Sequence, residues 1–244
     1  MAKYISNAPL WVIILFVMGF LYSIFLIAKP AKQAALDAGI SPGKSKNIQF
    51  GVFGFYLLYL AYVSILSLKG VFYQNTVPPK IMIFATIPLT VILFAFVGNT
   101  KLFKKLLHTI TLESLIIIHV FRFVGVFFII LYFYRLLPAS LAFSAETGDI
   151  VTALFAWPVA RWVSQRRSWS IKAVYVWNIF GILDIVNVLI IVGIAIKRSL
   201  ISGAGGGLGE MTIFPFSWFP AFAPGTILFL HAAIFRKLRQ VKGK

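Results

Sequence analysis

Several ionisable side chains stand inside long apolar stretches of the sequence, and five of them are candidates for one buried site. The five are His119, Arg122, Asp149, Asp184 and His231. Within a lipid bilayer such groups are costly, so they usually face the interior of a helix bundle and mark an ion path or a ligand site. Arginine keeps its proton in a protein, so Arg122 needs a carboxylate or another anion beside it. These residue types predict a buried polar site that pairs ions and transfers protons.

Helical spacing places several of these side chains on shared faces. His119 and Arg122 are three residues apart and are therefore neighbours on one helix face. Asp149 shares a face with Glu146 and Thr152 by the same rule. Asparagines on the Asp184 segment add amide groups. The candidate buried polar site comprises Arg122, Asp149, Asp184, His231, His119, Asn178 and Asn187.

Small and helix-bending residues accompany two of these groups. Gly181 lies almost one turn before Asp184, so another helix can approach closely beside the carboxyl group. Pro220 and Pro224 share a helix face with His231, and proline can bend a helix because it lacks a backbone donor. Gly181, Pro220 and Pro224 are therefore candidates for gating or for a helix kink.

Membrane-spanning helices must position these groups. The chain has 244 residues, 60% hydrophobic and 12% charged, whereas soluble domains are about half apolar and about a quarter charged. A spanning helix needs about 20 mostly apolar residues. Seven runs meet this need: 9–28, 49–68, 80–98, 110–136, 146–163, 173–196 and 217–235. The sequence predicts an all-α membrane protein, with seven transmembrane helices in a single domain over 1–244.

Basic residues between the runs predict the orientation. Sixteen lysines and arginines fall on one side of the membrane and six on the other when the connecting segments alternate. The richer side is formed by segments 29–46, 101–105, 161–172 and 236–244. Positive charge marks the cytoplasmic side of a membrane protein. We therefore expect the N-terminus outside and the C-terminus in the cytoplasm.

Depth along the helices predicts that the ionisable groups meet. With a rise of about 1.5 Å per residue, Arg122 and Asp184 lie near the midpoints of their runs. His119 and His231 then lie roughly 5 Å and 7 Å toward the cytoplasmic side, and Asp149 lies about 6 Å toward the outside. One layer near the middle of the membrane can hold all five.

The polar groups are distributed unevenly along the chain. The three runs within residues 1–98 carry almost no buried charge, whereas residues 99–244 carry nearly all of it. The first part is expected to be a scaffold half and the second a polar-site half. A glycine-rich segment, 202–209, lacks the lysine and hydroxyl ending of a phosphate-binding loop, and we expect an outside linker or lid there.

Composition narrows the chemistry and the partners. The chain has no cysteine, which excludes disulfides, thiolate metal ligands and thiol catalysis. It has no HExxH, GxSxG or other nucleophile–base motif, which favours a non-enzymatic role. The net charge of +17 is divided into short clusters between apolar runs. That pattern is typical of contact with membrane lipids, through anionic headgroups at the cytoplasmic face, and not of nucleic-acid binding.

Several short motifs follow one another in order through the second half of the chain. They are His119-Val-Phe-Arg122-Phe-Val-Gly125, Leu137-Pro138, Phe143, Gly148-Asp149, Trp177-Asn178-x-x-Gly181-x-x-Asp184, Met211-Thr, Pro215, Phe219-Pro220, Pro224 and Leu230-His231. In this order the chain resembles a family of bacterial multi-pass integral membrane proteins of unassigned function. The resemblance covers roughly residues 112–239, and the first three runs match only in hydropathy. It implies a shared architecture in the bacterial cytoplasmic (inner) membrane and brings no known activity.

Two departures from that family pattern bear on the site. Members of the family carry Ala-Gly-x-Gly-Asp where this chain has Ala145-Glu146-Thr-Gly148-Asp149. Another residue can also stand at the position of His119. The resemblance therefore favours Arg122, Asp149, Asp184 and His231 as the nucleus of the site.

Three functions stay open at this point. Small-solute, ion or proton-coupled membrane transport would use Asp149 or Asp184 as the protonatable group, Arg122 as counter-ion or anion site and a histidine as proton relay. A membrane redox protein would bind haem between His119 and His231, or a divalent metal at His119, Asp184 and His231. A receptor, lipid-binding or assembly scaffold is the third, and topology alone does not assign it. The buried charges favour transport.

Overall fold

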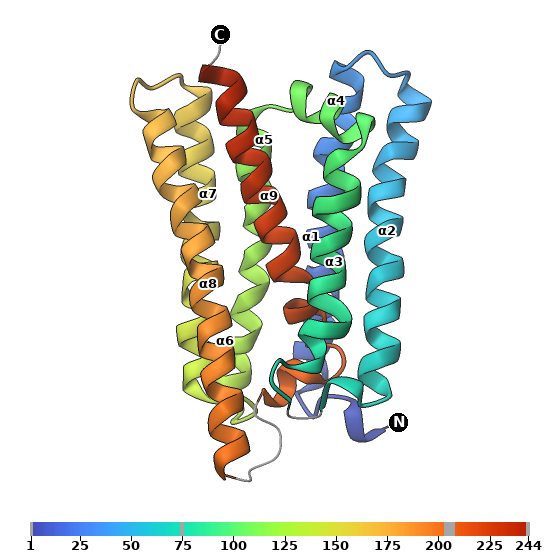
Figure 1. Ribbon diagram of the computed structural model, residues 1–244, viewed down its shortest axis with the longest axis vertical. Coiled ribbons are helices and arrows are strands. Elements are labelled where there is room, and N and C mark those ends of the chain that lie inside the picture. Colours follow the sequence, from blue (N-terminus) through green and yellow to red (C-terminus); the bar gives the residue numbers. More distant parts are fainter. Residues whose placement is uncertain (1, 74–75, 203–207, 243–244) are drawn as a thin grey trace.

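The computed structural model describes residues 2–73, 76–202 and 208–242. Within these ranges the secondary structure is helical, apart from one isolated bridge between Ile5 and Phe214. The all-α prediction is therefore confirmed for the described residues. Figure 1 shows the long helices running along the long axis, with the N-terminus near one end and the C-terminus near the other. We call these the N-terminal and C-terminal ends of the bundle.

The first half begins with a helical hairpin. Helix α1 (Leu10–Asp37) is followed by α2 (Pro42–Leu68). The third long helix changes its winding along its length, and a short helix then follows at the C-terminal end. These pieces are π-helical η3 (Met82–Thr86), α3 (Ile87–Val91), π-helical η4 (Ile92–Phe96), 3₁₀-helical η5 (Val97–Asn99) and α4 (Lys101–Thr109). Two short 3₁₀ turns, η1 (Ala2–Tyr4) and η2 (Val71–Tyr73), lie at the N-terminal end.

The second half contains the segments that carry the candidate site. A continuous helix from Leu112 to Phe133 comprises α5 (Leu112–Ile117), 3₁₀-helical η6 (Ile118–Gly125) and α6 (Val126–Phe133). The remaining elements are π-helical η7 (Ser140–Ala145), α7 (Thr147–Ser164), α8 (Ser170–Ser202), η8 (Gly209–Thr212) and α9 (Trp218–Lys242).

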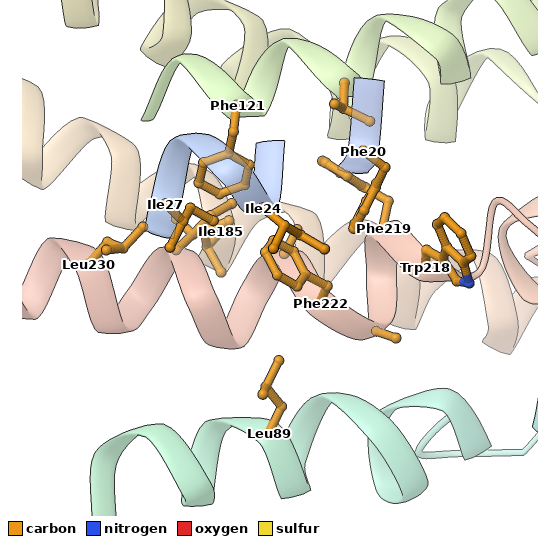
Figure 2. Close-up of a cluster of buried hydrophobic side chains, with 14 of the residues drawn as sticks. Phe20, Ile24, Ile27, Leu89, Phe121, Ile185, Trp218, Phe219, Phe222 and Leu230 are labelled. Carbon is orange, nitrogen blue, oxygen red and sulfur yellow. The ribbon is translucent and has the colours of Figure 1, made fainter. Parts of the chain in front are cut away.

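Helix α9 is the centre of the bundle. In its most apolar stretch 72% of the residues are buried, against 22% in α8. Figure 2 shows α9 residues facing side chains of several other helices. The Phe222 ring lies 5.2 Å from the ring of Phe20 on α1 and 5.8 Å from that of Phe121 on η6. His231 of α9 is therefore held inside the protein and away from lipid.

Six helices are long and apolar enough to cross a membrane, within the described residues. They are Leu10–Asp37, Pro42–Leu68, Met82–Asn99, Leu112–Phe133, Ser170–Ser202 and Trp218–Gln240. Large apolar side chains are exposed along them, which is what a lipid solvent requires and water does not. The architecture is that of a multi-pass integral membrane protein. The predicted run 146–163 is not among the six, because α7 carries Asp149, Pro158 and Arg161 within 18 residues.

The predicted boundaries were too narrow at the C-terminal end. Helix α1 continues nine residues past the predicted end at 28, and α2 begins at Pro42 instead of 49. Lysines that the sequence placed in a loop, such as Lys32 and Lys44, therefore lie on helices. Polar residues can continue a helix beyond the hydrocarbon region, so the apolar run marks only the part within lipid. The sequence analysis also missed α4.

At the N-terminal end, the first residues pair with the segment before α9. The Ser6 amide donates to the Phe214 carbonyl at 2.9 Å, and the Phe214 amide donates to the Tyr4 carbonyl at 3.0 Å. Glu210 of η8 is also buried and interacts with Ser6. Burial raises the pKa of the Glu210 carboxyl group above its ordinary value, and a hydrogen bond with Ser6 offsets part of that rise.

We expect Glu210→Gln to stabilise the protein more at pH 7.5 than at pH 4. The folded pKa is raised above the unfolded one, so the ionised carboxylate disfavours folding once pH passes about 4, where an unfolded glutamate ionises. Glutamine has no such charge, and its benefit grows with pH. Melting temperatures of both proteins at the two pH values test this. An equal difference at both would contradict it.

Candidate functional site

Arg122 is the centre of a buried network of charged and polar side chains. Its side chain is fully buried. The Nε atom donates to Oδ1 of Asp149 in a short ion pair, and Nη2 donates to Oδ2 of Asp184 at 2.5 Å. The third nitrogen, Nη1, lies 3.2 Å from Nε2 of His231. Three elements, α7, α8 and α9, therefore each present one partner to the same guanidinium group.

The winding of η6 aims Arg122 into the bundle. The chain follows a 3₁₀ helix for eight residues in the middle of the fourth predicted run, although such runs seldom exceed three or four residues and often mark functional positions. A 3₁₀ helix has three residues per turn, so His119, Arg122 and Gly125 stand directly above one another. All three are buried. The 3₁₀ winding thus keeps these three residues on one buried face in the middle of the helix.

Hydrogen-bond partners define the tautomer of His231. A guanidinium group can only donate, so Nε2 of His231 accepts from Arg122. The proton of the neutral ring is then on Nδ1, which donates to Oδ1 of Asn178 at 2.8 Å. Asn178 in turn donates from Nδ2 to the His231 carbonyl at 3.2 Å. In this arrangement His231 is a neutral imidazole that holds Arg122 in place.

Three polar groups around the network are buried and have no hydrogen-bond partner. They are both ring nitrogens of His119, Oε2 of Glu146 and the hydroxyl of Thr152. Glu146 interacts electrostatically with Asp149, Asp184 and Arg122. Most buried polar atoms in proteins are hydrogen-bonded, and exceptions call for a functional explanation. Within the described residues, these three side chains are therefore buried polar groups that the hydrogen bonds of the Arg122 network leave out.

Three glycines let the helices approach the network. A Cβ atom on Gly148 would overlap the Asp184 carboxyl group, and one on Gly181 would overlap the His231 ring and lie 3.0 Å from Nη1 of Arg122. A Cβ atom on Gly125 would lie 2.5 Å from Oε2 of Glu146. Larger residues would therefore displace these polar groups.

Two hollows reach the carboxyl groups from different sides. A cavity of about 40 Å³ touches Glu146 and Asp149, and its other walls, from η3, α8, η8 and α9, are almost wholly apolar. A surface groove of about 610 Å³ between η7–α7 and α8 reaches Asp184, and Asn187 and Thr147 line it. Asp184 is the more exposed of the two aspartates that Arg122 binds, with 5% of its side-chain surface accessible against 3% for Asp149.

The structure brings most of the predicted site residues together. Arg122, Asp149, Asp184, His231 and Asn178 form one network, and the His119 ring centroid lies 4.2 Å from that of His231. Asn187 is the exception. It is exposed and donates to the Ser144 carbonyl at 3.0 Å, so it lies in the groove and outside the network.

The predicted gating residues lie beside the network. Pro224 cannot donate to the Pro220 carbonyl four residues earlier, and the Thr86 hydroxyl donates to that carbonyl instead, at 2.9 Å. Both prolines line the small cavity at Glu146 and Asp149. Gly181 lies against His231, as described above. Residues 203–207 of the glycine-rich segment predicted as a lid lie outside the described residues.

The sequence analysis placed Glu146 on the face of Asp149 but left it out of the site. Its three-residue spacing from Asp149 was the signal that could have included it. Gly125 and Gly148 were also missed as site residues. Their value depends on contacts between different helices, and spacing along one helix does not report those.

The two histidines do not fit the haem or metal sites considered from the sequence. The His119 and His231 rings face each other with centroids 4.2 Å apart, which leaves no room for a porphyrin between two axial ligands. Asp184 and His231 both direct acceptor atoms at Arg122, where a metal ion would compete with a fixed cation. In the part of the chain that the structure describes, no group of three potential ligands is arranged for a metal.

We expect Gly181→Ala to destabilise the protein by about 1–3 kcal/mol, the usual cost of forcing extra volume into a packed site. The added methyl group would displace His231 and Arg122. Gly193→Ala on the same helix is the matched control, because a Cβ atom there meets nothing within 4 Å, and it should be neutral or stabilising by roughly 0.5–1 kcal/mol. Thermal unfolding in detergent measures both. Equal effects would contradict the packing described above.

A known protein family matches the part of the chain that carries the network. Residues 78–239 match the model of the family described as Domain of unknown function (DUF8737), which is more than half of the chain and includes every residue of the network. No curated protein and no solved structure matches. The chain therefore belongs to the family defined by this domain of unknown function.

Proposed function

We propose that this chain is a transport protein of the membrane in which the Arg122 network takes up and releases protons. One observation carries the proposal: a single buried guanidinium group binds the carboxyl groups of Asp149 and Asp184, and a third buried carboxyl group, that of Glu146, interacts with it electrostatically. A purely structural ion pair needs one carboxylate for one arginine. The additional acids need another explanation.

The charge balance of the network favours bound protons. If all three carboxyl groups were ionised, the network would carry two uncompensated negative charges in a site nearly closed to water. Uncompensated charge in a low-dielectric interior is strongly unfavourable, and such a group neutralises itself by binding a proton. Carboxyl groups this close share protons and titrate as a unit. The network can therefore store a proton and release it when its surroundings change.

His119 is suited to pass such a proton onward. Its ring is buried, it contacts the His231 and Trp177 rings, and neither nitrogen is hydrogen-bonded. A neutral imidazole donates through one nitrogen and accepts through the other, which is the requirement for a relay. His231 is committed to Arg122 and Asn178 and would serve to orient the arginine.

The groove at Asp184 opens between α7 and α8 on the side of the bundle, and the small cavity touches Glu146 and Asp149. Of the two aspartates that bind Arg122, Asp184 is the one nearer the surface of the bundle. Asp184 would exchange protons at the groove, and Glu146 would hold one inside.

We also propose seven membrane passages, with the N-terminus outside and the C-terminus cytoplasmic. Helix α7 would be the added passage, because it exposes Leu154, Phe155 and Trp157 as a lipid-facing helix does. Termini at opposite ends of the bundle accord with an odd number of passages. The excess of basic residues at the C-terminal end favours this orientation. The family resemblance favours a bacterial cytoplasmic (inner) membrane.

We expect the protein to admit protons into liposomes and Asp184→Asn to abolish this. Asparagine cannot carry a proton, although its oxygen can still accept from Arg122. Liposomes containing a trapped pH-sensitive dye would be given a potassium diffusion potential, and the rate of internal acidification measured. The variant should acidify at the rate of protein-free liposomes.

Asn187→Ala is the control for that experiment. Asn187 is almost one turn from Asp184 and lines the same groove, but it bonds only the Ser144 carbonyl. The control should acidify like the unaltered protein. Acidification by the unaltered protein that does not exceed protein-free liposomes would overturn the proposal, as would an Asp184→Asn protein that conducts normally.

A further inference from the structure

A third hollow lies apart from the Arg122 network, in the C-terminal half of the bundle. Its volume is about 420 Å³, within the range of about 300–1,000 Å³ typical of small-molecule sites. Its walls come from α1, α2, η4–η5, α4, α5, the first residue of η6 and α9. Helix α4 covers it near the end of the bundle, where Phe103, Leu106 and Leu107 line it.

The lining of this cavity is apolar. Among the described residues that line it, only Tyr56 and Thr100 have polar side chains. The Thr100 hydroxyl donates to the Val97 carbonyl at 2.8 Å, and the Tyr56 hydroxyl accepts from that of Thr226 at 3.5 Å. Both are thus occupied within the protein. A ligand inside this cavity would be recognised by its hydrocarbon surface.

The cavity opens to the surroundings of the bundle beside α2. Gly51 lines it and is itself exposed. A Cβ atom on Gly51 would meet nothing within 4 Å. The opening is on the side of a membrane-spanning helix, so it faces the lipid hydrocarbon. A lipid chain could enter there without crossing water.

Basic residues lie on α2 and α4, two of the helices that line the cavity. Lys44 is exposed and lies one turn before Ile48, on the face of α2 that lines the cavity. Helix α4 is amphipathic, with apolar residues toward the cavity and Lys101, Lys104 and Lys105 exposed. Such a helix lies at the membrane surface, with its lysines at the level of the anionic headgroups. The cavity therefore lies directly beneath the level of lipid phosphates.

We propose that this cavity binds one acyl chain of an anionic phospholipid, with its phosphate at Lys44 and the lysines of α4. The apolar lining and the lateral opening select the chain. The positive charge of these lysines selects a negatively charged headgroup over a zwitterionic one. This site is independent of the Arg122 network, because the two share no lining residue.

Native mass spectrometry of the purified protein with dioleoylphosphatidylglycerol or dioleoylphosphatidylcholine tests the site. We expect one tightly held phosphatidylglycerol and weaker retention of phosphatidylcholine. Gly51→Leu should weaken phosphatidylglycerol binding by about tenfold, because the new side chain fills space that several methylene groups would occupy. Lys44→Gln should reduce the preference between the two lipids without filling the cavity.

Gly54→Leu is the matched control. Gly54 also lies on α2 and has nothing within 4 Å of an added Cβ atom, but it does not line the cavity. Melting temperatures would show that both leucine variants fold. Equal retention of the two lipids by the unaltered protein, or equal effects of the two leucine substitutions, would overturn the proposal.

Discussion

The charge on Arg122 is the constraint on which this structure depends. A guanidinium group in the middle of a membrane helix cannot discard its proton and cannot reach water. Each of the three guanidinium nitrogens of Arg122 is bound by one acceptor, and the three acceptors come from α7, α8 and α9. Removing any one partner would leave a buried N–H group of Arg122 without an acceptor, so the positions of these helices are tied together through one side chain.

Other features of the fold follow from that requirement. The 3₁₀ winding of η6 keeps His119 and Gly125 in line with Arg122. Glycines at 125, 148 and 181 remove side chains where the network needs space. The central position of α9 keeps His231 away from lipid. The Thr86 hydroxyl donates to the Pro220 carbonyl, which Pro224 cannot do because it has no backbone N–H. The network nevertheless contains more acid than the arginine can balance, and that excess is the basis of the proton transport that we propose.

Much of the site could be predicted from the sequence, because a charge in an apolar run must find a partner. Depth and helical spacing brought Arg122, Asp149, Asp184 and His231 to one layer, and the structure places them in contact. The depth of a residue in the membrane does not define the direction in which its side chain points. Asn187 was therefore grouped with Asp184, although it faces the groove and bonds the Ser144 carbonyl. Counting apolar runs also missed α4 and the helical extensions of α1 and α2. These segments lie beyond the hydrocarbon, so they are not continuously apolar.

Infrared spectroscopy of the purified protein at neutral pH tests the central claim most directly. A protonated carboxyl group has a carbonyl stretch that an ionised carboxylate lacks, and a detergent without carbonyl groups leaves that region clear. If three acids share one arginine, at least one holds a proton, and the band should be present and should weaken in Glu146→Gln. A spectrum without the band, which would mean that all three carboxyl groups are ionised, would contradict this account.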